Sequence, residues 1–217
     1  MPSSEVSLAL FVPLKAKDDK VNDVSQFLAA GLDLVLANEP ETIQWYGVKY
    51  ADTIPPTFAI LDTFRAESGR AAHLNGKVAE ALMANAPTLL STGPQITQPT
   101  ILANKVTVLG GTTKTAGLTV GLRVLLDAKP EFVQAVKEFL IGGLELVEAE
   151  TETPVWYAFE LPGTTKFGIV DFFADENGRN AHLNGKVAAA LFGKADEWFA
   201  KPPSVVKFDV IAASVKM

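Results

Sequence analysis

The spacing of apolar residues predicts the same order of elements twice along the 217-residue chain. In residues 19–37 and 130–149, apolar side chains recur every three or four positions, which is typical of an amphipathic helix. Short runs rich in aromatic and β-branched residues flank these segments and predict strands. The predicted strands are residues 6–14, 42–50, 57–64, 101–109, 118–126, 154–160, 166–173 and 204–215. The predicted helices are residues 19–37, 70–85, 130–149 and 179–192, with short helical turns at 87–90 and 195–200.

A seven-residue repeat shows that the chain contains two copies of one unit. The sequence His-Leu-Asn-Gly-Lys-Val-Ala occupies residues 73–79 and returns letter for letter at residues 182–188. Such self-similarity is the mark of a repeated structural unit. The glycine- and threonine-rich segment 110–114 has little to bury and predicts the junction. We therefore predict two units, residues 1–110 and 111–217.

The predicted strands do not alternate between apolar and polar residues. Residues 57–61 and 167–170 are apolar at successive positions, whereas an antiparallel sheet with one wet face would alternate. Both faces of each sheet therefore need cover, from the helices on one side and from the other unit's sheet on the other. We predict an α+β fold in which two tandem ferredoxin-like β-α-β-β-α-β units form an intramolecular pseudo-dimeric α+β barrel.

Gly76 and Gly185 fall inside the predicted second helix of each unit. A glycine in a helix interior costs about 1 kcal/mol relative to alanine, so both copies accept this cost at the same position. The small-residue face around each glycine predicts a close approach by a helix, a loop or a ligand.

Composition excludes several classes of function. The chain has no cysteine, which excludes disulfides and thiolate metal sites. Its net charge is −6 and no basic cluster is interleaved with aromatic residues, so nucleic acid is not an expected partner. No apolar run approaches the roughly 20 residues of a membrane span, and no signal peptide is recognisable, so we expect a cytoplasmic protein without membrane contact.

Two matching motifs resemble a known family. Each has an acidic-x-aromatic triplet at the end of a strand followed by an Ala-His-Leu step on a helix: Asp62-Thr63-Phe64 with Ala72-His73-Leu74, and Asp171-Phe172-Phe173 with Ala181-His182-Leu183. The chain is similar over nearly its whole length, as two tandem units, to the antibiotic biosynthesis monooxygenase-like family of the dimeric α+β barrel superfamily. Many members carry a second histidine three residues after the first, where this chain has Gly76 and Gly185.

The resemblance implies a cofactor-independent monooxygenase that acts on a quinol, polyphenol or polyketide-like aromatic substrate between the sheet and the helices of each unit. Related barrels include polyketide cyclases, haem-degrading oxygenases and binding proteins without a known reaction. The alternatives are therefore a polyketide cyclase, or a non-catalytic barrel that binds a small apolar ligand or assembles with itself.

His73 and His182 are the candidate catalytic residues, because histidine is the usual general base for a phenolic proton. The alternative is a hydrogen-bonded histidine at the edge of the core. Arg70 and Arg179 could bind an acidic phenol, although ion pairs with the aspartates of the two motifs are the preferred interpretation.

The remaining candidate substrate-binding residues are two asparagines and two aromatic pairs. Asn75 and Asn184 could hold an oxyanion, or could be structural. The aromatic pairs are Trp45-Tyr46 and Trp156-Tyr157. Side chains alternate along a strand, so one of each pair should face the helices and the other the barrel interior. Such aromatic residues suit a flat substrate and an ordinary core equally.

We expect no metal and no cofactor. Two histidines in separate units, with no cysteine, make no multi-ligand motif, and haem on an axial histidine is the remaining cofactor alternative. The expected partner is a small aromatic or apolar molecule, and further homodimerisation of the fused pair is left open. If only one pocket is active, the second unit is favoured, because its hairpin turn is shorter.

Overall fold

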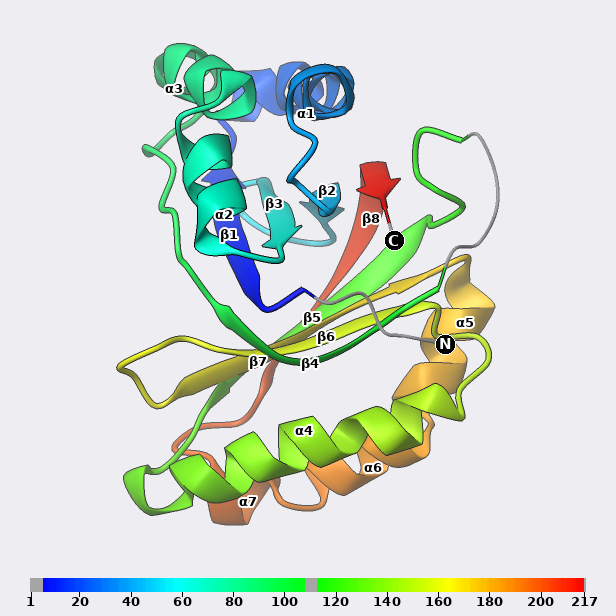
Figure 1. Cartoon of the computed structure of the whole chain (residues 1–217). Coiled ribbons are helices and arrows are strands. Elements are labelled where there is room, and N and C mark those ends of the chain that lie inside the picture. The colour runs from blue at the N-terminus through cyan, green and yellow to red at the C-terminus, as the bar shows by residue number, and fades with distance from the viewer. Residues whose placement is uncertain (1–5, 108–112, 217) are drawn as a thin grey trace.

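The computed structural model describes residues 6–107 and 113–216, and its strands close into one eight-stranded barrel (Figure 1). The order around the barrel is β1-β3-β2-β8-β5-β7-β6-β4, and neighbouring strands are antiparallel. The strands are β1 Leu8–Lys15, β2 Gln44–Tyr50, β3 Thr57–Phe64, β4 Thr100–Val106, β5 Val120–Asp127, β6 Val155–Glu160, β7 Lys166–Phe173 and β8 Ser204–Val215. The predicted pseudo-dimeric α+β barrel is confirmed.

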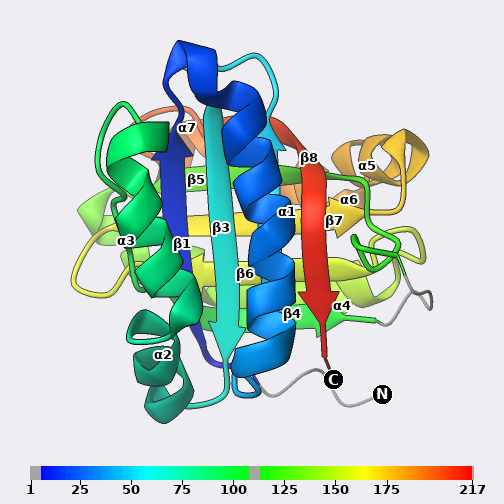
Figure 2. The same ribbon diagram turned by 90° about the horizontal axis from the view of Figure 1, so that it is seen from above.

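Helices cover the outside of the barrel in two layers on opposite sides (Figure 1). The first layer is α1 Val21–Asn38, α2 Glu67–Leu74 and α3 Lys77–Leu89, and the second is α4 Val133–Glu148, α5 Glu176–Leu183, α6 Lys186–Phe192 and α7 Ala195–Trp198. Figure 2 shows the helices α1 and α3 of the first layer running along the strands β1 and β3. Single 3-10 turns, Asp18–Lys20 and Pro130–Phe132, precede α1 and α4. In the described part of the chain, no helix combines the length and the apolar character needed to cross a membrane.

The last strand of each half completes the barrel by pairing with the other half. β4 pairs with β6 over most of its length and meets β1 at a single pair, Leu8 with Thr100. β8 lies between β5 and β2, and Figure 1 shows this red strand rising beside β2. The predicted boundary between residues 110 and 111 lies outside the described residues, so the division into units 1–110 and 111–217 stays a prediction.

The aromatic pairs of β2 and β6 divide between two cores, as predicted from strand alternation. Trp45 and Trp156 are buried in the cores between sheet and helices. Tyr46 and Tyr157 are buried in the barrel interior, where their hydroxyl oxygens lie 2.9 Å apart. The interior is therefore packed with side chains, which explains why strands β3 and β7 are buried on both faces.

The predicted helices 70–85 and 179–192 are each broken in the middle. α2 ends at Leu74 and α3 begins at Lys77, because Gly76 has an extended backbone with ψ −177°. Gly185 separates α5 from α6 in the same way, with ψ 177°. The expectation of a glycine inside a helix was therefore wrong. The separate helical turn at 87–90 was also wrong, because α3 continues to Leu89.

Candidate functional site

His73 lies between two carboxylates that come from different elements. Its Nδ1 is 2.5 Å from Glu39 Oε2, and its Nε2 is 3.3 Å from Asp62 Oδ2. The histidine is 5% exposed, and Asp62 is completely buried. Asp62 comes from β3, Glu39 directly follows α1, and His73 lies near the end of α2. The fold thus brings together three ionisable groups that are far apart in sequence.

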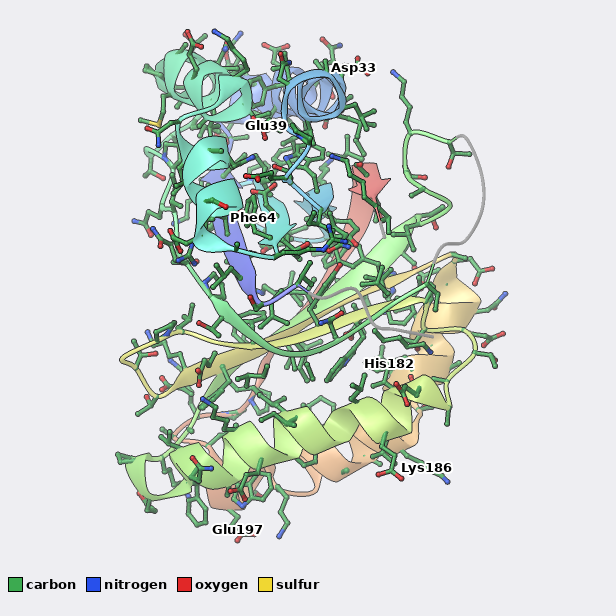
Figure 3. All side chains as sticks on the ribbon, viewed as in Figure 1. Asp33, Glu39, Phe64, His182, Lys186 and Glu197 are labelled. Atoms are coloured by element: carbon green, nitrogen blue, oxygen red, sulfur yellow. The ribbon has the colours of Figure 1, made fainter. Side chains whose placement is uncertain are left out.

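The second half repeats this arrangement. His182 Nδ1 is 2.6 Å from Glu150 Oε2, and Nε2 is 3.2 Å from Asp171 Oδ2. His182 is 6% exposed. We call these two arrangements the Glu–His–Asp clusters. Figure 3 shows their positions on opposite sides of the molecule, with Glu39 labelled in the first and His182 in the second.

The glycine of the repeat lets the glutamate reach the histidine. A Cβ on Gly76 would lie 2.7 Å from Glu39 Oε1, and one on Gly185 would lie 2.7 Å from Glu150 Oε1. Glu39 Oε1 also accepts a 3.3 Å hydrogen bond from the backbone N–H of Val78, in the first turn of α3. The helix break, the glycine and the histidine therefore form one structural unit in each half.

The carboxylates hold both histidines in the protonated state. Burial disfavours the charge on His182, but Asp171 and Glu150 outweigh it and raise its pKa to about 10. Burial opposes the charge on His73 too, and Asp62 and Glu39 raise its pKa to about 8. At neutral pH each ring therefore carries a proton on both nitrogens and cannot itself accept another.

The buried aspartates are the groups able to take up another proton. Burial raises the pKa of Asp62 to about 7, against the attraction of the His73 charge. Burial also raises the pKa of Asp171. The pKa of Glu39 moves the opposite way: burial would raise it, but the hydrogen bond and charge of His73 outweigh burial and lower it. Near neutral pH, the first cluster can therefore gain or lose a proton at Asp62.

Each cluster reaches the wall of a surface cavity. One cavity, of about 390 Å³, is lined by Glu150, His182 and Lys186, and its counterpart of about 380 Å³ is lined by Glu39 and His73. The side chain of Glu150 is 19% exposed and that of Glu39 only 6%. A ligand in the second cavity therefore has easier access to its glutamate.

Sequence reasoning missed both glutamates, although a signal for them was present. The pattern Glu-x-Glu-Thr occurs at residues 39–42 and again at 150–153, at matching places after the first helix of each half. The threonine hydroxyls donate to the carboxylates, Thr42 to Glu39 at 3.1 Å and Thr153 to Glu150 at 2.8 Å. A search for repeated acidic residues, and not only for the longest identical run, would have found them.

The arginines do not pair with the motif aspartates, so this expectation was wrong. Arg70 instead contacts Glu67, with Nη2 2.5 Å from Oε2. Arg179 contacts Glu176 and donates to two backbone carbonyls, those of Gly121 and Phe208, both at 3.2 Å. Each aspartate is enclosed beside a histidine. The nearest acidic partner of each arginine is therefore the glutamate three residues before it, on the same helical turn.

The other candidate residues do not gather around the histidines. Asn75 and Asn184 are exposed and donate to the carbonyls of Ala71 and Asn180, which satisfies acceptors at the ends of α2 and α5. The four residues Trp45, Tyr46, Trp156 and Tyr157 are buried in the cores and are not among the described residues that line the two cavities. A role of these six residues in substrate binding stays a prediction.

The histidines do not fit the axial position of a haem. Both nitrogens of each ring contact a carboxylate, so neither ring offers a free nitrogen to iron. Within residues 6–107 and 113–216, no group of three or more His, Asp or Glu side chains is arranged to hold a metal ion.

Solved structures share this fold at low sequence identity. A protein from Fusobacterium nucleatum, provisionally named a monooxygenase, matches 100% of this chain and 96% of its own, with 13% identity and a TM-score of 0.86. An anthrone oxidase-like protein matches 96% of this chain and 92% of its own, with 9% identity and a TM-score of 0.61. A haem-degrading enzyme from Listeria monocytogenes matches 93% and 98%, with 7% identity and a TM-score of 0.52.

These likenesses establish the barrel fold and not an activity. No family model matches the chain, and no curated protein resembles it in sequence.

Proposed function

We propose that the chain is a cofactor-independent monooxygenase of a quinol, polyphenol or polyketide-like aromatic substrate. The observation that carries the proposal is the duplicated Glu–His–Asp cluster at the wall of a cavity of about 390 Å³ in one half and about 380 Å³ in the other. Cavities of this size suit a small aromatic molecule. Neighbours with the same fold are named as a monooxygenase and as anthrone oxidase-like, which supports the same kind of reaction.

The cluster supplies the proton transfer that such a reaction needs. An electron-rich phenolate can pass an electron to O2, whereas the neutral phenol is a poor donor, so removing the hydroxyl proton comes first. Glu150 accepts this proton at the cavity, and the protonated His182 ring, held between Glu150 and Asp171, keeps the positive charge that stabilises the phenolate. The histidines therefore supply charge in this proposal and are not the bases that the sequence predicted. Overall, one oxygen atom of O2 enters the substrate and the other leaves as water, and the substrate itself supplies the four electrons and the two hydrogens of the water as it is oxidised to a quinone or ketone.

The second half is the favoured site, because Glu150 is the more exposed of the two glutamates. The test is O2 uptake with a panel of quinols and anthrone-like phenols, comparing the wild type with Glu150→Gln and with the double variant His73→Ala/His182→Ala. Glu152→Gln is the matched control, since it changes the same charge on the rim of the same cavity. We expect uptake to be lost in the double variant, strongly reduced in Glu150→Gln and retained in the control.

A non-catalytic binding module is the second candidate function. It is favoured by the occupation of both ring nitrogens in each histidine, which is also the arrangement of a purely structural ion cluster. In that case a phenolic ligand would saturate the cavities, as followed by calorimetry, while O2 uptake stayed at the level of the double variant.

A further inference from the structure

A second, narrower pocket lies on the other side of the His182 ring. His182 lines both pockets, whereas Glu150, its Nδ1 partner, lines the wide cavity and Asp171, its Nε2 partner, lines the narrow one. The narrow pocket has a volume of about 20 Å³ and lies between the sheet and α6. Its aliphatic and aromatic walls include Leu122, Val124 and Ile169 from the strands and Val187, Leu191 and Phe192 from α6.

The walls of the narrow pocket favour an apolar occupant. A volume of about 20 Å³ accommodates one molecule of the size of water or a diatomic gas. A trapped water normally makes two to four hydrogen bonds, roughly, and apolar cavities without such partners stay dry and take up xenon. Both His182 nitrogens are already engaged with carboxylates, and Asp171 Oδ1 is the buried, unpartnered oxygen beside this apolar wall. A water in this pocket could donate one hydrogen bond to Asp171 Oδ1, but the rest of its surroundings would be mostly hydrocarbon.

The pocket also has a route from the surface. Phe192 belongs to its wall and is 44% exposed, so the outer rim of the pocket reaches solvent past this ring. A small apolar gas can pass such a rim by side-chain motion on the picosecond to nanosecond scale, without unfolding of α6.

We propose that this pocket binds dioxygen and holds it against the Nε2 edge of His182. The inference rests on the proposed monooxygenase function, for which O2 is the co-substrate. The phenolic substrate enters the wide cavity on the Glu150 side, and O2 is stored on the Asp171 side, so the imidazole separates the two entry routes.

Dioxygen under pressure is the probe, because it is the proposed ligand and, without a phenol present, is not consumed. Crystals of the wild-type chain would be pressurised with O2 and compared with Ala188→Val and Val124→Ile, which fill the pocket from the helix side and from the strand side. Ala79→Val, at the matching position of the first repeat, is the control. We expect the elongated density of O2 in the pocket of the wild type and of Ala79→Val, and its loss in both filling variants.

Activity provides an independent second measurement. The filling variants should raise the KM for O2 several-fold and leave the KM for the quinol unchanged. Bound O2 in the pocket of a protein that consumes no O2 with any phenol would support the gas pocket and refute the proposed function. An empty pocket under O2 pressure, or an ordered water bonded to Asp171 Oδ1, would overturn the inference.

Discussion

The charge on His182 is stabilised by two carboxylates that reach the ring from a strand and from the end of a helix. Its folded pKa, raised to about 10, lies above the ordinary value of 6.5. The folded state therefore binds this proton more tightly than the unfolded state. The resulting stability is complete below the unfolded pKa and is lost as the pH rises through the folded pKa.

The upward shift of the histidine pKa values predicts that the protein becomes less stable as the pH rises. For His73 the loss falls between pH 6.5 and about 8, and for His182 between pH 6.5 and about 10. Urea unfolding across this range should show the free energy of unfolding decreasing with pH in the wild type. The quadruple variant His73→Gln/Asp62→Asn/His182→Gln/Asp171→Asn should lose most of that dependence; the aspartates are replaced as well because, without the histidine charges, burial would raise their pKa values further. An equally steep decrease in the quadruple variant would contradict the assignment.

The pKa of His182 also depends on Glu150. Glu150→Gln removes one of the charges that raise the pKa of His182, so this pKa should fall by about 1 unit or more. The chain has two histidines, so NMR titration of the imidazole resonances can follow both. Glu152→Gln should leave the titration unchanged, and His73 serves as an internal reference in each sample.

At the scale of elements, the break between α5 and α6 exists to admit a carboxylate. Gly185 has φ −81° and ψ 177°, a conformation open to any residue, so the requirement for glycine comes from contact and not from the backbone. A Cβ there would lie 2.7 Å from Glu150 Oε1 and 3.0 Å from the His182 carbonyl oxygen. Gly185→Ala should therefore push Glu150 away from the histidine.

We expect Gly185→Ala to lower the free energy of unfolding by about 1–3 kcal/mol, the usual cost of overpacking. The matched control is Gly142→Ala in α4, where a Cβ meets nothing within 4 Å. This control should stabilise the protein by roughly 0.5–1 kcal/mol, because alanine is the better helix former. Urea unfolding measures both. A stabilising Gly185→Ala would show that the glutamate does not need the space.

The helices and strands show how much of the fold the sequence could predict. Apolar spacing places strands and first helices well, because burial of one helix face or both strand faces leaves a direct pattern. The break at Asn75-Gly76 could not be predicted in this way. Glu39, whose carboxylate contacts the break, lies far away in sequence, and the local pattern on either side of the break is helical. The partners of the arginines were missed for the same reason, since the histidines claim the aspartates through tertiary contacts.

At the scale of the whole molecule, neither half has a complete sheet or a complete core of its own. β4 takes most of its pairing from β6, β8 is paired along one side with β2, and α1 packs on β8 while α4 packs on β4. In the barrel interior, Tyr46 from one half meets Tyr157 from the other, hydroxyl to hydroxyl. The contacts between the two halves are therefore part of the core of one molecule.

This mutual dependence predicts the behaviour of separated halves. Residues 1–110 and 111–217, expressed as two chains, should each fail to form a stable folded monomer, because each leaves unpaired strand edges and an apolar sheet face exposed. Mixed together, they should form a 1:1 complex, as measured by light scattering. The complex should have the circular dichroism spectrum of the intact chain. Tyr46→Phe/Tyr157→Phe, which removes the polar contact between the halves and preserves the ring packing, is the control, and it should still assemble. A half that stays monomeric, with cooperative thermal unfolding of its own, would show that the units fold independently and that their pairing is only docking.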